Sequence, residues 1–453
     1  MDKTRNFLAL IKGKLWLLPL ILTLGSAIVA VILILYGNHF VSSGDGNLWW
    51  LYSGDAETGR QLLSSLLSGL MTMTSLVISV TFVILTLAAN QLGPRLISRF
   101  MADRQIQTVL GLFIGTILYL ILVLRSVTDK LGEEGVPHLA ITTGSALTVL
   151  CLLALLFYIH KVARSIIADN MVQALYSDML ATMDSVLPPK DTPKREPLGA
   201  RFAGPRHSLA IGTVGHVQVV GYALLLDLAV REDIRMTVHV RAGQYLLAKG
   251  DHVTVFASEA PEDDTLSAIR AAFTIGSERT PAQDLEFGIR QLTEIAVRAL
   301  SPGINDPFTA LAVIDRISAI IEGQIGRAVQ PTEYRDDDDD LRLIVSRTDL
   351  RRLMDAGFRP IRQAGADHPA ILARMAIRLA DLAVADMLDA ERAALSAQIE
   401  ALAQAGEACA CIPVDRDEIR AQVEAARSRI SDTDRHADPA APVPPSSNRV
   451  EPA

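Results

Sequence analysis

Hydroxyl side chains recur along one apolar stretch of the chain, Leu62–Ala89, and just beyond its end. Together they form what we call the hydroxyl stripe: Ser64, Ser68, Thr72, Ser75, Ser79, Thr86 and Asn90. Their intervals of three, four and seven residues place them on one face of a helix. Side-chain oxygens in a membrane pore can replace part of an ion's hydration shell, but small hydroxylated residues also favour close packing between membrane helices. The stripe therefore indicates a water-lined path or a helix–helix contact, and both interpretations stay open.

Ionisable side chains are absent from Leu62–Ala89. Proton-coupled pumps and transporters usually carry acids, bases or histidines inside their membrane helices. If this stretch borders a permeation route, a channel fits the sequence better than a pump.

A basic elbow follows the stripe. Gly93 and Pro94 interrupt the helical pattern, and Arg95 and Arg99 then recur at helical spacing. Such a segment is typical of a cytoplasmic turn that touches anionic lipid headgroups. The alternative is a joint that couples a cytoplasmic domain to a pore.

A second dense motif lies far along the chain, at residues 279–310. Its polar candidates for a ligand-binding cleft are Arg290, Glu294, Arg298, Asn305 and Asp306. Glu294 and Arg298 are four residues apart and can pair on one helix face. Asp306 stands before Pro307, which is typical of a helix N-cap followed by proline at the first helical position. The motif predicts either two capped helices joined by a rigid turn or a polar site, and we expect capping.

Catalytic and metal-binding patterns are missing from the sequence. No nucleophile–base pair, Walker pattern or dinucleotide-binding fingerprint is present. The three cysteines lack the partners of a zinc site. The net charge of −8 argues against nucleic acid as a partner. We therefore expect a protein that is not an enzyme and that holds neither a metal nor a cofactor.

Long apolar stretches occur only in the first part of the chain, at Leu15–Tyr36, Leu62–Ala89, Val109–Leu124 and Leu139–Ile159. Their lengths approach the roughly 20 residues that a helix needs to cross a bilayer. Since backbone polar groups must be satisfied internally in lipid, these stretches predict membrane-spanning helices. The first is too long for the apolar core of a signal peptide.

Charged residues flank these stretches unevenly. Bases gather in the N-terminal arm, between the second and third stretches and after the fourth, whereas acids dominate the other two loops. The positive-inside rule then places both termini and the soluble domain in the cytoplasm, with the spans in a bacterial inner membrane.

The sequence beyond the spans alternates between strand and helix patterns. We expect a membrane domain over residues 1–165, a connecting helix and linker over 166–200, a small strand-rich subdomain over 201–260, a helical subdomain over 261–430 and a disordered tail over 431–453. Single helices are predicted over Asp264–Ile275 and Pro369–Ala405. The fold class is a mainly α membrane protein with a cytoplasmic α+β domain.

Three segments resemble a known family. The segment Gln91–Phe100 (Gln-Leu-Gly-Pro-Arg-Leu-Ile-Ser-Arg-Phe), together with Gln283–Leu292 and Ala299–Pro307, is similar to the bacterial "predicted membrane protein" family of unknown function. The resemblance covers about Leu8–Met387 and implies four N-terminal spans with a cytoplasmic domain, but no activity.

Two classes of function follow. The first is a channel-like homo-oligomer that passes a small ion or other ligand and carries a cytoplasmic regulatory domain. The second is a membrane-anchored sensor or scaffold whose cytoplasmic domain binds a ligand or a protein. The hydroxyl stripe favours the first class, because its polar groups would meet in a symmetric assembly.

Overall fold

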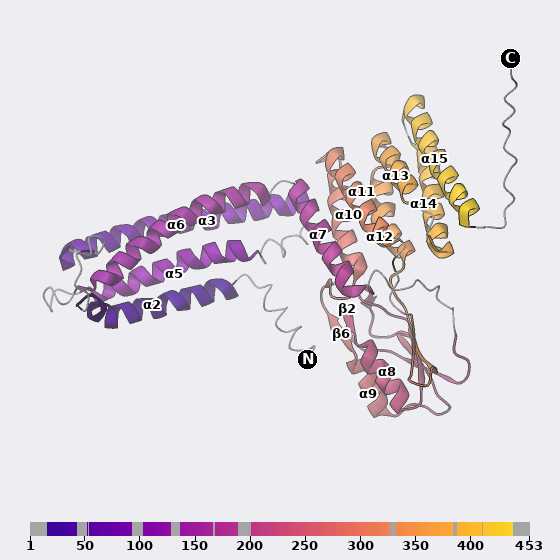
Figure 1. Cartoon of the computed structure of the whole chain (residues 1–453), viewed down its shortest axis with the longest axis horizontal. Helices are drawn as coiled ribbons and strands as arrows, with labels where there is room; N and C mark the ends of the chain where they lie inside the picture. The colour runs from indigo at the N-terminus through magenta and orange to yellow at the C-terminus, as the bar shows by residue number, and fades with distance from the viewer. Residues whose placement is uncertain are drawn as a thin grey trace, which may run out of the picture. The chain divides into compact units, whose positions relative to one another are not determined.

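The protein forms two compact units, Met1–Asn170 and Met171–Ala453, which are described separately (Figure 1). A computed structural model describes residues 16–42, 52, 54–92, 103–127, 136–165, 168–188, 201–325, 327, 332–383, 387–409 and 411–437. The basic elbow at Gly93, Pro94, Arg95 and Arg99 lies outside these residues.

The first unit consists of long apolar helices. They are α2 (Leu17–Ser42), α3 (Ala56–Leu92), α5 (Arg104–Ser126) and α6 (His138–Ser165). Each is long and apolar enough to cross a membrane, so the four expected spans are confirmed. The helices extend beyond the apolar stretches because polar residues at both ends continue the helical backbone.

Glycines on α5 allow α2 to pack closely against it. A Cβ atom on Gly111 would lie 2.9 Å from the Cα of Pro19, and one on Gly115 would lie 2.6 Å from Ser26 Oγ. The four-residue spacing of these glycines is the small-residue pattern that brings membrane helices together. The close contact between α2 and α5 therefore requires residues without side chains at positions 111 and 115.

The helix α3 packs against the bundle through a narrow seam. Leu63, Leu70, Val77 and Ile84, spaced seven residues apart, are at most 5% exposed. This heptad spacing keeps one face of a helix turned toward its neighbours. The opposite face of α3 is left uncovered by the described helices of the unit.

The second unit begins with α7 (Ala168–Val186), whose first residues belong to the first unit, and continues with two small sheets. The first sheet has the order β1 (Arg206–Leu209), β5 (Val253–Phe256), β3 (Arg235–Val238), β8 (Leu341–Val345), β7 (Glu333–Arg335). The second has the order β4 (Tyr245–Leu246), β2 (Gly215–Val220), β6 (Phe273–Gly276). Strands β3 and β8 pair in parallel although about a hundred residues separate them.

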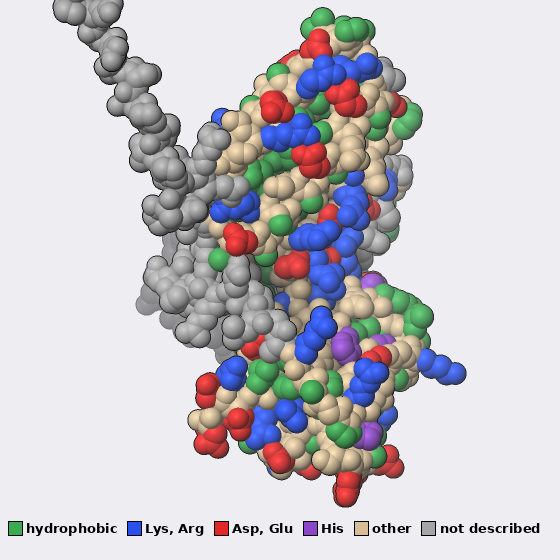
Figure 2. All heavy atoms as spheres, turned by 90° about the vertical axis from the view of Figure 1, so that its right-hand side faces the viewer, with side chains coloured by type: hydrophobic (Ala, Val, Ile, Leu, Met, Phe, Trp, Pro, Cys, Tyr) green, Lys and Arg blue, Asp and Glu red, His purple; other side chains and the backbone are tan. Residues whose placement is uncertain are grey.

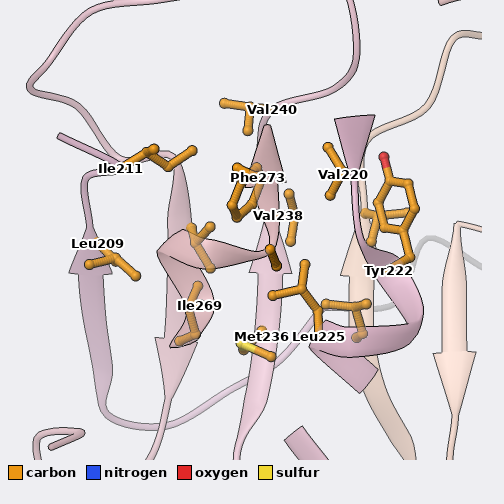
Figure 3. Packing of buried hydrophobic residues seen from close by; sticks show 14 of the residues in the cluster. Leu209, Ile211, Val220, Tyr222, Leu225, Met236, Val238, Val240, Ile269 and Phe273 are labelled. Atoms are coloured by element: carbon orange, nitrogen blue, oxygen red, sulfur yellow. The ribbon is translucent and has the colours of Figure 1, made fainter. Parts of the chain in front are cut away.

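The helices α8 (Tyr222–Arg231) and α9 (Asp263–Ala271) share an apolar core with these sheets. Leu225 of α8 and Ile269 of α9 meet Met236 and Val238 of β3, and Figure 3 shows these side chains pointing toward one another. All four are at most 1% exposed. Burial of this core is the main stabilising contribution for the sheets.

The remaining helices form two layers. One layer holds α10 (Leu285–Ala299), α12 (Leu350–Ala364) and α14 (Asp389–Ala408); the other holds α11 (Pro307–Glu322), α13 (Pro369–Asp381) and α15 (Pro413–Ala437). Successive helices thus stack as pairs, as in α-solenoids (Figure 1).

A proline is accommodated inside this stack. Pro360 of α12 lacks the amide that would bond to the Ala356 carbonyl. The Thr293 hydroxyl of α10 lies 3.1 Å from that oxygen and can donate to it. The same hydroxyl lies 2.8 Å from the Ile289 carbonyl of its own helix, so its single proton is shared between that oxygen and the backbone group that the proline leaves without a donor.

Several expectations need correction. The helix over Asp264–Ile275 ends at Ala271, because Phe273–Gly276 pairs with β2. The single helix over Pro369–Ala405 is two helices, although neither Gly nor Pro marks the break. Residues 431–437 belong to α15 and not to a tail, while residues 438–453 lie outside the described residues. Residue 260 does not separate strands from helices, because β6 and β7 come after it. Strand β8, also after it, agrees with the strand that the run Leu-Arg-Leu-Ile-Val-Ser predicts at Leu341–Ser346.

Candidate functional site

The start of α10 is tied to the second sheet by the Gln283 side chain. Its Oε1 accepts from the Val220 amide at 3.0 Å, and its Nε2 donates to the Val220 carbonyl at 3.1 Å. Gln283 thereby pairs with β2 much as a neighbouring strand residue would. Asp284 then caps the helix by accepting from the Glu286 amide at 3.1 Å.

A buried charge cluster lies at this end of α10. It comprises Arg241, Arg279, Asp284, Glu286 and Arg290. Arg279 Nη2 lies 2.6 Å from Asp284 Oδ2. Glu286 is held from two sides, by Arg241 Nη2 at 2.7 Å and by Arg290 Nη2 at 2.9 Å. The carboxylates of Asp284 and Glu286 are only 1% and 5% exposed, so charged partners are required to offset their desolvation.

The two carboxylates titrate differently. Burial raises the pKa of Asp284, although the Arg279 guanidinium acts against this shift. Burial also opposes ionisation of Glu286, but hydrogen bonds from Arg241 and Arg290 outweigh it and lower the pKa of that carboxyl. Glu286 is therefore the anion around which the arginines gather.

Two glycines let the backbone approach the cluster. Gly243 has φ +85°, and a Cβ there would lie 2.2 Å from Asp284 Oδ2. Gly288 faces α7, where a Cβ would lie 2.7 Å from Met179 Sδ. The cluster thus sits between the turn that joins β3 to β4, α10 and α7.

Little free volume remains beside the cluster. A cavity of about 10 Å³ is lined by residues that include Tyr222, Arg241, Gln283 and Arg347. That volume holds about one water molecule and excludes an organic ligand. Among the described residues, no group of three or more His, Cys, Asp or Glu is placed to hold a metal ion. The buried charge cluster therefore holds the turn after β3 against α10 through ion pairs.

The expected polar site along α10 is divided by the structure. Arg290 belongs to the buried charge cluster, whereas Asn305 and Asp306 lie past the opposite end of the helix. About 13 Å of helix separates Arg290 from Ala299, the last residue of α10. Glu294 and Arg298 lie on the helix between these ends. The residues of the motif therefore do not converge on one cleft.

The turn after α10 has the geometry expected of a cap. Asp306 Oδ1 accepts from the Thr309 amide at 3.1 Å, and Oδ2 accepts from the Thr309 hydroxyl at 2.6 Å. Asn305 adopts φ +50°, a left-handed conformation that asparagine tolerates better than most residues. This geometry accounts for Asn305 and Asp306 without a ligand.

The hydroxyl stripe faces away from its own bundle. Ser64, Ser68, Thr72, Ser75, Ser79 and Thr86 are all exposed. The side chain of Asn90 lies outside those described. Thr72 and Thr86 donate to carbonyls one turn earlier, those of Ser68 at 3.0 Å and Phe82 at 2.9 Å. Packing against α2, α5 or α6 of the same chain therefore does not explain the stripe.

Four members of the buried charge cluster were missed as site candidates: Arg241, Arg279, Asp284 and Glu286. Three of them lie within the 279–310 motif, so the density of charges near a predicted N-cap was an available signal. Arg241 lies in a turn after β3, and its approach to Glu286 depends on tertiary structure alone.

Comparison with known proteins gives a family without an assigned activity. The family described as "Predicted membrane protein (DUF2254)" matches residues 12–381. "Uncharacterized protein Mb1321c" of Mycobacterium bovis and "Uncharacterized protein Rv1290c" of Mycobacterium tuberculosis are each 26% identical over 419 residues, covering 90% of this chain and 79% of theirs. No solved structure matches significantly. The chain belongs to the DUF2254 family of predicted membrane proteins.

Proposed function

We propose that the protein is a homo-oligomeric, channel-like membrane protein in which copies of α3 border a hydrated path. The observation that carries this proposal is the outward position of the hydroxyl stripe. It lies opposite the seam of Leu63, Leu70, Val77 and Ile84, so it is available to a second copy. The proposal assigns no catalytic step to the chain.

The physical reason is the cost of polar groups in hydrocarbon. A threonine can satisfy its hydroxyl through its own helix, as Thr72 and Thr86 do. Even so, serine and threonine hydroxyls that face lipid make no favourable interaction with the hydrocarbon. Facing one another across a symmetry axis, they would meet water or pair between copies.

We further infer that the second unit lies in the cytoplasm of an inner membrane and regulates the path. The uneven distribution of basic residues between loops supports this orientation. Thiol-specific labelling from outside should modify a cysteine at Gly46 or Gly135 but not one at Ser98 or Ser208. Labelling of the Ser208→Cys variant from outside would contradict this orientation.

The helix α7 supports a regulatory connection. It follows α6 in the chain, and its C-terminal part is fastened within the second unit: Arg327 Nη1 lies 3.0 Å from Asp184 Oδ1, and Nη2 donates to the Pro188 carbonyl at 3.2 Å. Met179 of α7 also packs against Gly288 near the buried charge cluster. A rearrangement at that cluster would therefore reach α7 directly.

Conductance across planar bilayers tests the proposal. The triple variant Thr72→Leu, Ser75→Leu, Ser79→Leu should lower or abolish conductance, because it replaces the hydroxyls of the stripe. A matched control changes exposed apolar residues of the same helix: Met71→Leu, Leu76→Ile and Val83→Leu. Absence of conductance in the wild type under voltage, tension and osmotic challenge would count against a channel.

Oligomerisation is tested separately by the mass of the protein in native-like lipid. We expect a defined homo-oligomer, and the stripe triple variant should shift its mass distribution toward smaller species. A wild-type protein that is strictly monomeric in lipid would remove a path between copies.

The second candidate is a membrane-anchored sensor or scaffold. The stacked helix pairs α10–α15 favour it, because such arrays commonly serve as binding surfaces. An open groove of about 550 Å³ between α14 and α15 is bordered by the ion pairs Glu407–Arg420 and Glu400–Arg427. Function retained after exchange of the four spans for unrelated membrane helices would favour this candidate.

A further inference from the structure

The helix α12 (Leu350–Ala364) carries an unusual concentration of positive charge for an acidic chain. Its bases are Arg351, Arg352, Arg359 and Arg362, against a single acid, Asp355, whereas the whole chain has a net charge of −8. We call the exposed side of this helix, bearing these four arginines, the α12 basic face.

The other side of α12 is fully occupied. Leu353, Met354, Phe358 and Ile361 are at most 1% exposed. Gly357 is so closely packed that a Cβ would lie 2.7 Å from Ile317 Cγ2. The helix is fixed in the middle of its layer, between α10 and α14. Its basic face is therefore a rigid surface and not part of a loop.

Most charges on this face have no acidic partner. Arg359 pairs with Asp355 at 3.0 Å, and Asp355 also accepts from Gln398 Nε2 at 2.8 Å. Within the described part of the chain, Arg351, Arg352 and Arg362 form no ion pair. The Arg362 Nε is buried and lacks a hydrogen-bond partner there.

The arrangement contrasts with the neighbouring pair of helices. The exposed arginines of α15 are neutralised by carboxylates: Arg420 lies 3.0 Å from Glu407, and Arg427 lies 2.7 Å from Glu400. On the face shown in Figure 2, acidic and basic side chains alternate near the top, whereas lower down Lys and Arg gather in a band. Arginines that pair with carboxylates contribute little net charge to a surface, whereas unpaired arginines leave a positive potential that attracts an external anion.

Two of the unpaired arginines also stand where the helix disfavours them. Arg351 and Arg352 lie in the first turn of α12, where the helix dipole repels positive charge. The Asp349 carboxylate, which caps this turn by accepting from the Arg352 amide at 2.8 Å, offsets part of that contribution, and a further anion above the turn would add to this stabilisation. The basic face therefore has the electrostatics of a binding surface for phosphate groups.

We propose that the α12 basic face docks on the anionic headgroups of the bilayer in which the protein is anchored. The four spans hold the second unit near a membrane surface, so the local concentration of lipid phosphate is high. A row of arginines on one face of a helix matches an extended phosphate surface, and each basic residue there contributes to attraction. The inference does not depend on permeation and extends to either proposed function.

Arginine-specific modification measures this docking in the intact protein. The full chain is placed in lipid discs of phosphatidylcholine, with or without phosphatidylglycerol, and treated with phenylglyoxal. We expect phosphatidylglycerol to slow modification of the α12 basic face on the order of tenfold at low salt and much less at high salt. Arg420 and Arg427 of α15 serve as internal controls that should not change.

Substitutions sharpen the test without disturbing the packed side of α12. In the Arg351→Gln, Arg352→Gln, Arg362→Gln variant, the lipid-dependent protection of the remaining Arg359 should disappear. The matched variant Arg420→Gln, Arg427→Gln should keep it. Circular dichroism of both variants verifies that they remain folded.

Several outcomes would overturn the proposal. Equal protection in phosphatidylcholine alone would exclude anionic headgroups as the partner. If inorganic phosphate slows phenylglyoxal modification of the α12 basic face in discs of phosphatidylcholine alone, the partner of this face would be a soluble phosphate compound. Protection that survives high salt, or that persists in the triple variant, would show that the arginines do not mediate it.

Discussion

The two units of the protein handle buried polar side chains in opposite ways. Among the described residues of the first unit, the buried polar side chains are uncharged: Thr74, Gln107, Thr116 and Thr148. In the second unit, the buried polar side chains include the ionisable groups Asp284, Glu286 and Arg327. Thr74 and Thr148 donate to carbonyls of their own helices, at 2.7 and 2.9 Å, whereas Glu286 depends on Arg241 from another segment as well as on Arg290 of its own helix.

This difference follows from what surrounds each unit. Membrane helices insert one by one into hydrocarbon, where a charge costs several kcal/mol before any partner arrives. A unit that folds in water can bring distant charges together and bury them as pairs, provided that every charge finds its partner. The first unit should therefore be sensitive to shape, and the second to loss of charge.

The largest expected effect is loss of Glu286. Glu286→Gln leaves Arg241, whose side chain is 17% exposed, and Arg290, whose side chain is 46% exposed, facing a neutral amide, so we expect the second unit to lose about 3 kcal/mol of stability. Native-state hydrogen exchange of the α10 amides measures this loss in the full chain. The control Glu400→Gln removes an exposed partner of Arg427 and should cost less than about 1 kcal/mol. Equal effects at the two positions would remove the distinction between buried and exposed pairs.

Shape sensitivity of the first unit is tested at Gly111. Gly111→Val places a Cβ within 2.9 Å of the Pro19 backbone, which cannot move like a side chain, so overpacking should cost about 1–3 kcal/mol. The same substitution at Gly69, where no atom lies within 4 Å, is the control and should be tolerated. The temperature at which each variant aggregates in detergent ranks their stabilities. Equal aggregation temperatures would refute the close contact between α2 and α5.

The cap of α11 should have a smaller effect. Asp306→Ala removes both bonds to Thr309 and should cost about 0.5–2 kcal/mol, measured by hydrogen exchange at the start of α11. Asn305→Gly keeps the left-handed conformation and should change stability little. Loss of function in an Asp306→Ala protein that stays folded and inserted would instead identify the turn as a binding site.

The change in stability of the second unit with pH should be smaller than the effect of the Asp306→Ala substitution. Because the pKa of Glu286 is lowered in the folded state, its ionisation stabilises the fold above its unfolded pKa of about 4.3. This contribution disappears as the pH falls through the folded pKa. The stability difference between wild type and Glu286→Gln should therefore shrink toward low pH. A difference that stays constant from neutral to acidic pH would show that hydrogen bonding alone matters.

The sequence predicted the long helices better than the contacts between distant segments. Apolar runs define the four spans, and Asp306 before Pro307 identifies a cap, because both signals are local. The pairing of β3 with β8 and the approach of Arg241 to Glu286 join segments far apart in the chain. The break between α13 and α14 has no Gly or Pro to mark it in the sequence. The outward direction of the hydroxyl stripe depended on which face of α3 the other spans would cover.

Water accessibility along α3 tests the central claim most directly. Single cysteines are introduced at Ser68, Thr72, Ser75 and Ser79, and at Met71, Leu76 and Val83 as controls, in a background with Cys151, Cys409 and Cys411 replaced. In liposomes, a water-soluble thiol reagent should react with the stripe positions and not with the controls, since only the stripe borders the proposed path. Unreactive stripe positions, or equal reaction at every exposed position of α3, would contradict a hydrated path between copies.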